Sequence, residues 1–426
     1  SLFREELCMD RPVETILSGP AASVVGASFL MGDAIKNAVV IDIGGTTSDV
    51  ALLSGGMPKL NTQGVAVGPW QTHVAAIDMR TVGLGGDSHI RTDHKMEIHV
   101  GPKRVEPLSL FGVRHSGLLP NMKRLFSQRF NDDRFVPTNY WACTEKAVAQ
   151  ALSRREQDIL EVLSKGPLNI FQIAMRLDVY PISGHHELKR LEDLNLLSSG
   201  GFTPTDMFHI RRQYEPGVRE CAMIAAQYLA ARVGMDLDSF LLKVDEIIHR
   251  TVGLEVVEAL SSASTTFADF SDSCPACRET WRNCFWERGI EARQAKLGRF
   301  RMRLSLETPL VGIGAPSHIL LSSLAHRMDA EAIVPEHAEV ANALGAIMGT
   351  IIMHDQVLIR PLAPEGFACF TSAGKRVYPT IDEATEEGRR YLSQHLRTQV
   401  KRAGGNGCEV NLWEERKEAA LASGQK

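Results

Sequence analysis

Residues 38–54 read AVVIDIGGTTSDVALLS, and this stretch decides the fold. The run at 38–43 is apolar and rich in β-branched residues, which is typical of a buried strand, and 48–54 predicts a second strand. Only the four residues GGTT separate the two strands, so they must pair antiparallel. Strands and helical segments alternate along the rest of the chain, which predicts an α/β fold with a mixed sheet.

The turn between these strands carries residues suited to phosphate chemistry. Two glycines let the backbone bend sharply, successive N–H groups in such a bend bind anions, and two threonines add hydroxyl donors. Asp42 and Asp49 flank the turn and are predicted to act in catalysis and to hold Mg²⁺ through water. The alternative is a plain glycine turn between core strands, which the surrounding threonines and aspartates disfavour. The predicted phosphate contacts are Gly44, Gly45, Thr46 and Thr47.

Segments spread along the chain resemble the hydantoinase/oxoprolinase family. DIGGTTSDV at 42–50 is similar to the second phosphate motif of the actin and sugar-kinase superfamily, which implies an actin-like, ribonuclease H-like ATPase fold. Five further segments resemble the family in the family's own order. These are RPVETILSGPAASVVGA (11–27), VGPWQTHVAAIDMRTVGLGGDSHI (67–90), FTPTDMFHI (202–210), VGIGAPSHILLSSLA (311–325) and IVPEHAEVANALGAIMG (333–349).

The resemblance implies an ATP-using hydrolase, because relatives open the C–N bond of cyclic amides such as hydantoins and 5-oxoproline. A small cyclic amide is therefore the expected substrate, activated when ATP phosphorylates its amide oxygen. The β- and γ-phosphates and Mg²⁺ would lie at the glycine turn, and the adenosine at a second glycine-containing loop. The further residues implied to contact the nucleotide are Gly85, Gly86, Gly312, Gly314 and Ala315.

Two features depart from the family pattern. Relatives read DIHTVGAGGGS where this chain reads DMRTVGLGGDS, so Arg80 replaces a histidine and Asp87 replaces a glycine. Asp87 is either a solvated loop acid or a functional one, and we include it among the predicted catalytic residues. Actin-like ATPases bind nucleotide between two halves, whereas one phosphate turn is recognisable here. We therefore expect a fragment, inactive alone, that needs a missing N-terminal half of the same protein and has a second subunit as a further candidate partner.

The segment 146–202 interrupts the family-like sequence and has the pattern of a winged helix: three short helices and the glycine turn SSGGF. Its third helix offers Lys189 and Arg190 to DNA but also carries three acids. A DNA-reading helix needs a net basic face, so a module that packs internally or docks a partner is favoured over nucleic acid. Such a module keeps open a non-catalytic alternative, an actin-like ATP sensor or activator. The predicted domains are 1–145 and 203–400 (two parts of the ATPase subdomain), 146–202 (the insertion) and 401–426 (a tail whose CEVNLWE, 408–414, could form an edge strand).

Three of the eight cysteines, Cys274, Cys277 and Cys284, lie close together in the sequence. A structural zinc usually has four ligands, so three cysteines make Zn²⁺ a candidate cofactor beside ATP and Mg²⁺ rather than a firm prediction. Free thiols in a loop and a redox pair are the alternatives.

Charge and hydropathy exclude several classes of protein. The 51 acidic and 47 basic residues leave a net charge of −4, which does not suit nucleic acid or an anionic membrane as the main partner. No apolar run of about 18 residues could span a bilayer, and the start SLFREELCMDRP lacks the pattern of a signal peptide. With mostly scattered cysteines, these features predict a cytoplasmic protein without a disulfide framework.

Overall fold

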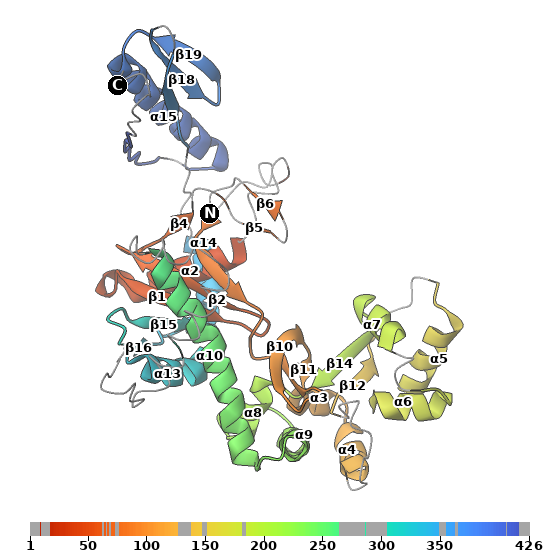
Figure 1. Cartoon of the computed structure of the whole chain (residues 1–426). Coiled ribbons are helices and arrows are strands. Elements are labelled where there is room, and N and C mark those ends of the chain that lie inside the picture. The colour runs from red at the N-terminus through yellow and green to blue at the C-terminus, as the bar shows by residue number, and fades with distance from the viewer. Residues whose placement is uncertain are drawn as a thin grey trace. The chain divides into compact units, whose positions relative to one another are not determined.

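A computed structural model describes residues 9, 18–61, 64, 66–67, 70–72, 76–126, 138–146, 151–180, 185–263, 286, 305–348, 355–362, 365–405 and 407–416. The chain forms two compact units, one of Ser1–Gly26, Leu60–Ile77 and Ala343–Lys426, the other of Ala27–Lys59 and Asp78–Asn342. Helices α2 (Ser18–Met31) and α14 (Ala341–Met348) each contribute residues to both units. The predicted mixed α/β fold is confirmed (Figure 1).

The central sheet of the second unit is built around the two strands predicted from the glycine turn. Strand β1 (Ala38–Ile43) pairs antiparallel with β2 (Ser48–Ser54) and parallel with β15, so the sheet is mixed, as predicted. The apolar, β-branched β1 is buried along nearly its whole length because it lies in the middle of this sheet. The order is β16–β15–β1–β2–β3, and β8 also pairs with β2; the remaining bounds are β3 (Met57–Pro58), β8 (Met79–Val82), β15 (Leu310–Ile313) and β16 (Ala332–Ile333).

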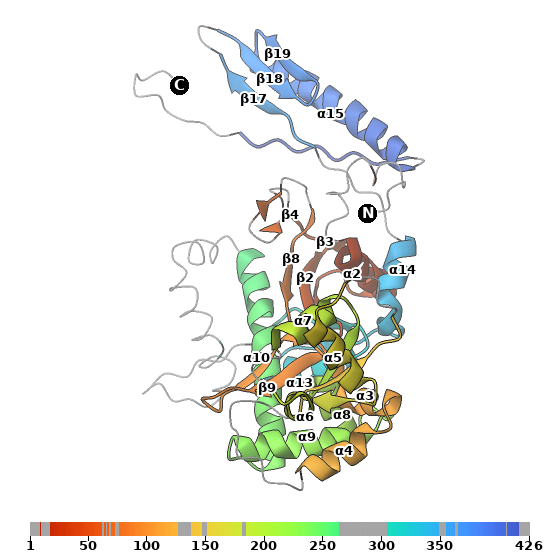
Figure 2. The same ribbon diagram turned by 90° about the vertical axis from the view of Figure 1, so that its right-hand side faces the viewer.

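Helices cover this sheet and share its hydrophobic core. Helix α10 (Leu237–Ala263) packs along β2 and β8, whereas α13 (Ser317–Met328) packs against β15 and β1 (Figures 1 and 2). Apolar side chains of β1, α9 and α10 belong to one continuous buried cluster, which fixes the sheet edge where β1 and β15 end. The other helical and hairpin elements of this region are η2 (Gly32–Ala34), β9 (Ser88–Thr92), β10 (Ile98–Arg104), α3 (Leu108–Arg114), α4 (Leu118–Phe126), α8 (Pro204–Ile210), α9 (Arg219–Arg232) and η5 (Ala338–Val340).

The segment predicted as an insertion has a hydrophobic core of its own. Its three helices are α5 (Arg154–Leu163), α6 (Ile170–Leu177) and α7 (His185–Asp193). Their buried side chains, which include Ile159 and Leu191, pack together with Trp141. The first helix begins at Arg154, because the Ser153 and Glu156 side chains form a capping box there. A four-stranded sheet joins the helices in the order β11 (Glu106–Pro107), β14 (Leu197–Gly201), β12 (Tyr140–Cys143) and β13 (Leu168–Asn169).

The other unit contains elements that the sequence analysis did not single out. Strands β17 (Leu358–Pro361), β18 (Phe367–Thr371) and β19 (Gly374–Tyr378) form an antiparallel sheet, and α15 (Ile381–Ala403) packs against it. Thr380 caps the start of α15 and Gly404, with φ of 107°, ends it. Two short strand pairs complete the unit: β4 (Leu60–Asn61) with β7 (Ala76–Ile77), and β5 (Ala66–Val67) with β6 (Trp70–Gln71).

The predicted edge strand at 408–414 is wrong, since the chain has no regular secondary structure over 407–416. Its alternating residues satisfy a strand pattern, but a strand also needs a hydrogen-bonding partner, and the tail instead makes an ion pair between Glu414 and Arg389 of α15. Among the helices that the structure describes, none combines the length and the apolar character needed to cross a bilayer.

Candidate functional site

The glycine turn closes as a four-residue hairpin at the end of β1. The N–H of Gly44 donates to the carbonyl of Thr47 at 2.9 Å, and Asp42 lies opposite Asp49 in the β1–β2 register. The phosphate hairpin, as we call residues 44–47, therefore carries one aspartate at the base of each arm. Thr46 is exposed, and the other three residues are half-buried.

A second loop, residues 84–88, supports the phosphate hairpin from one side through the main chain. The N–H of Gly86 donates to the carbonyl of Gly44 at 2.9 Å, and the N–H of Asp87 donates to that of Gly45 at 2.7 Å. Across a trans peptide the C=O and N–H point in opposite directions, so the N–H groups of Gly45 and Thr46 face away from this support loop. Neither donates a hydrogen bond to any residue the structure describes. Two successive N–H groups on one side form the concavity that binds anions.

Gly85 and Gly86 belong to the support rather than to the open side of the hairpin. A Cβ added to Gly85 would lie 2.4 Å from the Gly44 carbonyl oxygen, so no larger residue permits this approach. The Gly86 carbonyl in turn accepts hydrogen bonds from the N–H of Thr205, at 2.9 Å, and from its hydroxyl, at 2.8 Å. The TPTD segment at the start of α8 thus holds the support loop, which holds the hairpin.

The structure also brings the predicted adenosine loop beside the phosphate hairpin. Strands β15 and β1 are parallel neighbours with Ile313 opposite Asp42, so both loops leave the same edge of the sheet. Gly314 has φ of 87°, and a Cβ there would lie 2.3 Å from the Ile43 carbonyl oxygen. Ala315 is exposed next to it, whereas Gly312 is buried, and its Cβ position is 2.9 Å from the Leu321 side chain. Gly312 therefore permits close packing of α13 on β15.

The two aspartates of the hairpin lie in different surroundings. Asp49 is 8% exposed, and its carboxylate accepts hydrogen bonds from the hydroxyls of Thr81, at 2.5 Å, and Thr47, at 3.5 Å. Burial raises the pKa of Asp49, the hydrogen bond from Thr81 opposes that rise, and repulsion from Asp42 adds to it. Asp42 is half-buried, and its Oδ1 atom lies 2.9 Å from the Cβ position of Gly314. Asp49 is thus a shielded acid and Asp42 a more open one.

Asp87 places a third carboxylate at the phosphate hairpin. Its Oδ2 atom lies 2.7 Å from where a Cβ of Gly45 would be, and the Arg104 guanidinium donates to the same oxygen. The three predicted catalytic aspartates therefore surround the hairpin. They are not a preformed metal cluster, since among the described residues the one group of three ligand types within 4.8 Å is Asp93, Glu97 and His99.

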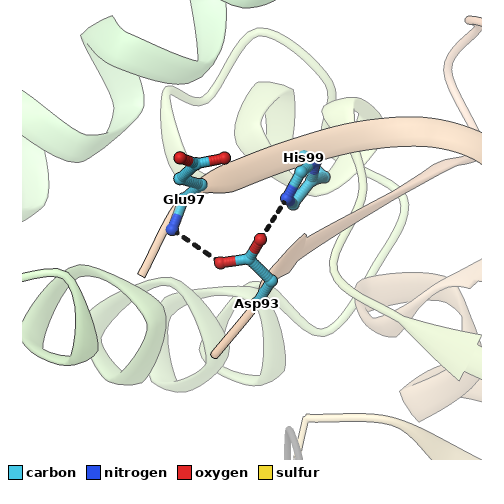
Figure 3. Close-up of side chains that lie close together, drawn as sticks. All are labelled: Asp93, Glu97 and His99. Carbon is cyan, nitrogen blue, oxygen red and sulfur yellow. Dashed lines mark hydrogen bonds and ion pairs between the residues drawn. The ribbon is translucent and has the colours of Figure 1, made fainter. Parts of the chain in front are cut away.

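That group belongs to the β9–β10 turn (Figure 3). Asp93 accepts hydrogen bonds from the N–H groups of Lys95 and Glu97, each at 2.9 Å, and from Nε2 of His99 at 2.9 Å. The hydrogen bond from His99 lowers the pKa of Asp93 to about 2. Because both oxygens already have donors, closure of the turn explains the cluster, and it carries no metal assignment.

Comparison with known proteins was most informative at the N-terminal end of the chain. Residues 1–115 match the family described as Hydantoinase/oxoprolinase. This match supports the resemblance to that family seen in the sequence. The matched segment contains both the phosphate hairpin and its support loop. No curated protein sequence matches the chain.

Two solved structures are distantly similar to most of the chain. One is acetone carboxylase in a nucleotide-free form, with 16% identity, a TM-score of 0.43, and coverage of 92% of this chain and 39% of that one. The other is the ATP-dependent caprolactamase from Pseudomonas jessenii, with 15% identity, a TM-score of 0.44, and coverage of 91% and 38%. This chain therefore spans about two fifths of the length of either.

Arg80, which stands where the hydantoinase/oxoprolinase pattern has histidine, faces away from the hairpin. Its guanidinium pairs with Glu258 of α10 at 3.1 Å, whereas the next residue of β8, Thr81, reaches Asp49. Alternation along the strand accounts for the two directions. Cys274, Cys277 and Cys284, the predicted zinc ligands, lie outside the described residues, so Zn²⁺ stays a prediction.

A buried polar cluster that the sequence did not predict lies beneath the TPTD segment. The fully buried carboxylate of Asp206 accepts hydrogen bonds from the hydroxyl of Ser109, at 2.6 Å, and from the N–H groups of Leu108, Ser109 and Thr203. His209 Nδ1 lies 3.1 Å from the same hydroxyl. A serine, a histidine and an aspartate thus meet, but the serine donates to the aspartate and all three are buried. This arrangement holds α8 to α3 and is not a nucleophilic site.

Proposed function

We propose that this chain carries the nucleotide-binding part of an actin-like, ATP-dependent hydrolase that acts on a cyclic amide. The carrying observation is the pair of N–H groups of Gly45 and Thr46, which point to the open side of a hairpin backed by main-chain hydrogen bonds. Asp42 and Asp49 stand at its base and the Gly314 loop beside it. The match of residues 1–115 to the hydantoinase/oxoprolinase family supports the cyclic-amide substrate.

In the proposed reaction the phosphate hairpin binds the β- and γ-phosphates of ATP. The N–H groups and the threonine hydroxyls donate to phosphate oxygens, while Asp42 and Asp49 would hold Mg²⁺ through water. Both carboxylates stand at the base of the hairpin, Asp42 half-buried and Asp49 bonded to the Thr47 hydroxyl, which fits contact with the ion through water. Transfer of the γ-phosphoryl group to the amide oxygen releases ADP and makes the ring carbon more electrophilic. Water adds to that carbon, the ring C–N bond breaks with the nitrogen leaving as an amine, and hydrolysis of the resulting acyl phosphate releases phosphate. The base for that water stays unassigned among the described residues.

The affinity of the chain for adenine nucleotides, measured by calorimetry, tests this proposal. If the hairpin binds phosphates, Mg-ATP binds measurably, Mg-ADP binds more weakly, and AMP, which lacks the β- and γ-phosphates, binds at least tenfold more weakly than Mg-ATP. Equal affinity for AMP and Mg-ATP, or no binding of either, contradicts the phosphate assignment. Steady hydrolysis by this chain alone would contradict the separate expectation that a second half completes the cleft.

We propose further that the segment 146–202 is a winged-helix-like module that packs internally or docks a protein. Two basic residues of its helices are already used within the fold: Arg190 pairs with Glu156 at 2.5 Å, and Arg155 pairs with Glu187 at 3.5 Å. Both pairs join α5 and α7, which leaves the third helix less able to offer a basic face to DNA.

A non-catalytic ATP sensor or activator is the second candidate function. It is favoured by Arg80, because the side chain at the family's histidine position is paired with α10 instead of facing the hairpin. ATPase assays of the full-length protein with and without hydantoin or 5-oxoproline separate the two functions. Turnover that rises with cyclic amide supports the hydrolase, whereas ATP binding with unchanged turnover supports the sensor.

A further inference from the structure

We propose that Arg104 is a phosphate-binding residue, held at the phosphate hairpin by Asp87 and contacting the terminal phosphate of ATP. The inference rests on the proposed nucleotide site and adds to it a cation and a specificity for triphosphate. It starts from the position of Asp87. The Asp87 N–H donates to the Gly45 carbonyl at 2.7 Å, and its carbonyl accepts from the N–H of Val105 at 3.0 Å. The main chain of Asp87 therefore links the hairpin to the residue that follows Arg104.

The side chains of Asp87 and Arg104 form a second link to the hairpin. Oδ2 of Asp87 lies at the face of Gly45, 2.7 Å from its Cβ position. Nε and Nη2 of Arg104 donate to that oxygen at 3.1 and 3.0 Å. The guanidinium thus lies one carboxylate away from Gly45, and from there it reaches a phosphate bound at the hairpin.

Arg104 has the capacity to bind a second anion. Its side chain is 65% exposed, against 21% for Asp87. Of the five N–H donors of a guanidinium, two are used by Asp87, and the other three donate to no residue among those described. Guanidinium groups bind phosphate through paired N–H donors, so Arg104 can keep its bonds to Asp87 and still donate to two phosphate oxygens.

The charge around the hairpin requires such a cation. Asp42, Asp49 and Asp87 would all repel a polyphosphate, and Arg104 is a cation paired with one of these acids. Neighbouring cations are engaged elsewhere: Arg80 pairs with Glu258, and Lys103 pairs with Glu192 at 3.3 Å. Arg104 is paired at the hairpin itself. Asp87 therefore stands where the family has glycine, and Arg104 is its counter-ion.

Calorimetric titration of the full chain with Mg-ATP and Mg-ADP tests the assignment. Arg104→Ala is expected to weaken Mg-ATP binding at least tenfold and Mg-ADP binding less than twofold, whereas Arg104→Lys restores part of the ATP affinity. Lys103→Ala removes the same charge one residue along the strand, from an ion pair with Glu192, and is expected to leave both affinities unchanged. Asp87→Asn keeps a hydrogen-bond acceptor for the guanidinium but removes the charge that holds it, and is expected to weaken Mg-ATP binding less than Arg104→Ala does.

The outcomes separate this inference from the proposed function. If the wild type binds Mg-ATP and Arg104→Ala binds it with the same affinity, the role of Arg104 is refuted but the nucleotide site is not. Equal losses for Mg-ATP and Mg-ADP also overturn it, since a contact with the terminal phosphate must discriminate between them. Wild-type protein that binds neither nucleotide overturns both proposals. An unchanged thermal midpoint in Arg104→Ala, expected from its exposure, shows that any loss of affinity is local.

Discussion

Replacement of Gly314 by alanine probes the contact that joins the two loops of the candidate site. Gly314 has φ of 87°, and its added Cβ would lie 2.3 Å from the Ile43 carbonyl oxygen and 2.9 Å from Oδ1 of Asp42. Positive φ costs a non-glycine residue about 1–3 kcal/mol. The overlap with backbone, which cannot rotate away, costs about another 1–3 kcal/mol. We therefore expect Gly314→Ala to lower the free energy of unfolding by about 2–6 kcal/mol, and to weaken Mg-ATP binding.

Guanidinium unfolding of wild type and variant measures this loss, and Gly56→Ala is the matched control. Gly56 has φ of 80° but no atom within 4 Å of its Cβ position, so its substitution has the strain of positive φ without the overlap. The expected difference between the variants is about 1–3 kcal/mol. If Gly314→Ala loses no more stability than Gly56→Ala, the loop does not press on the end of β1 as described.

Three further predictions follow from burial and charge. Burial raises the pKa of Asp49 above its ordinary 3.8, so its ionised form destabilises the fold; Asp49→Asn is expected to raise the thermal midpoint at pH 7, with a gain that shrinks as pH falls through that pKa, and to weaken Mg-ATP binding. Burial lowers the pKa of His89 from 6.5 to about 4, so between these pH values the unfolded chain binds a proton at this histidine and the folded chain does not. The free energy of unfolding therefore falls by about 3 kcal/mol from pH 7 to pH 4, and His89→Gln should lack this part of the pH dependence of stability. Because α5 and α7 pair their charges with each other, a DNA mobility shift at low salt and micromolar protein should be absent, and retardation would restore the nucleic-acid alternative.

The sequence was sufficient for the parts of the fold whose signals are local. A β-branched run, a four-residue glycine turn and a second strand require an antiparallel pair, and β1 and β2 form it with Asp42 opposite Asp49. The three short helices of the insertion were predicted from their sequence pattern, whereas where they start depends on caps such as Ser153. The sheet of β17–β19 went unrecognised, since its short strands carry charged residues on exposed faces and resemble loops in sequence.

Residues of the candidate site could be predicted where their type indicates their chemistry. Contacts between segments that are distant in the sequence could not be predicted. The glycines of the hairpin were identified from spacing. Gly85 and Gly312 were grouped with the nucleotide contacts, yet close approach to the Gly44 carbonyl and to α13 accounts for them, and no sequence pattern separates those causes. The partnership of Asp87 with Arg104 depends on a β9–β10 pairing in which Arg104 lies opposite Ser88, a register that the sequence left open.

The hydrogen bonds that back the hairpin run almost entirely between peptide groups: Gly86 to Gly44, Asp87 to Gly45, Thr205 to Gly86. A scaffold of this kind constrains chain length throughout, but residue identity only where a Cβ would collide, as at Gly85. Side chains at its rim can change from neutral to charged while the N–H groups keep their direction, which is how an acid can occupy position 87. New substrates can therefore arise by exchange of rim residues, whereas a one-residue deletion in 84–88 should abolish the site outright.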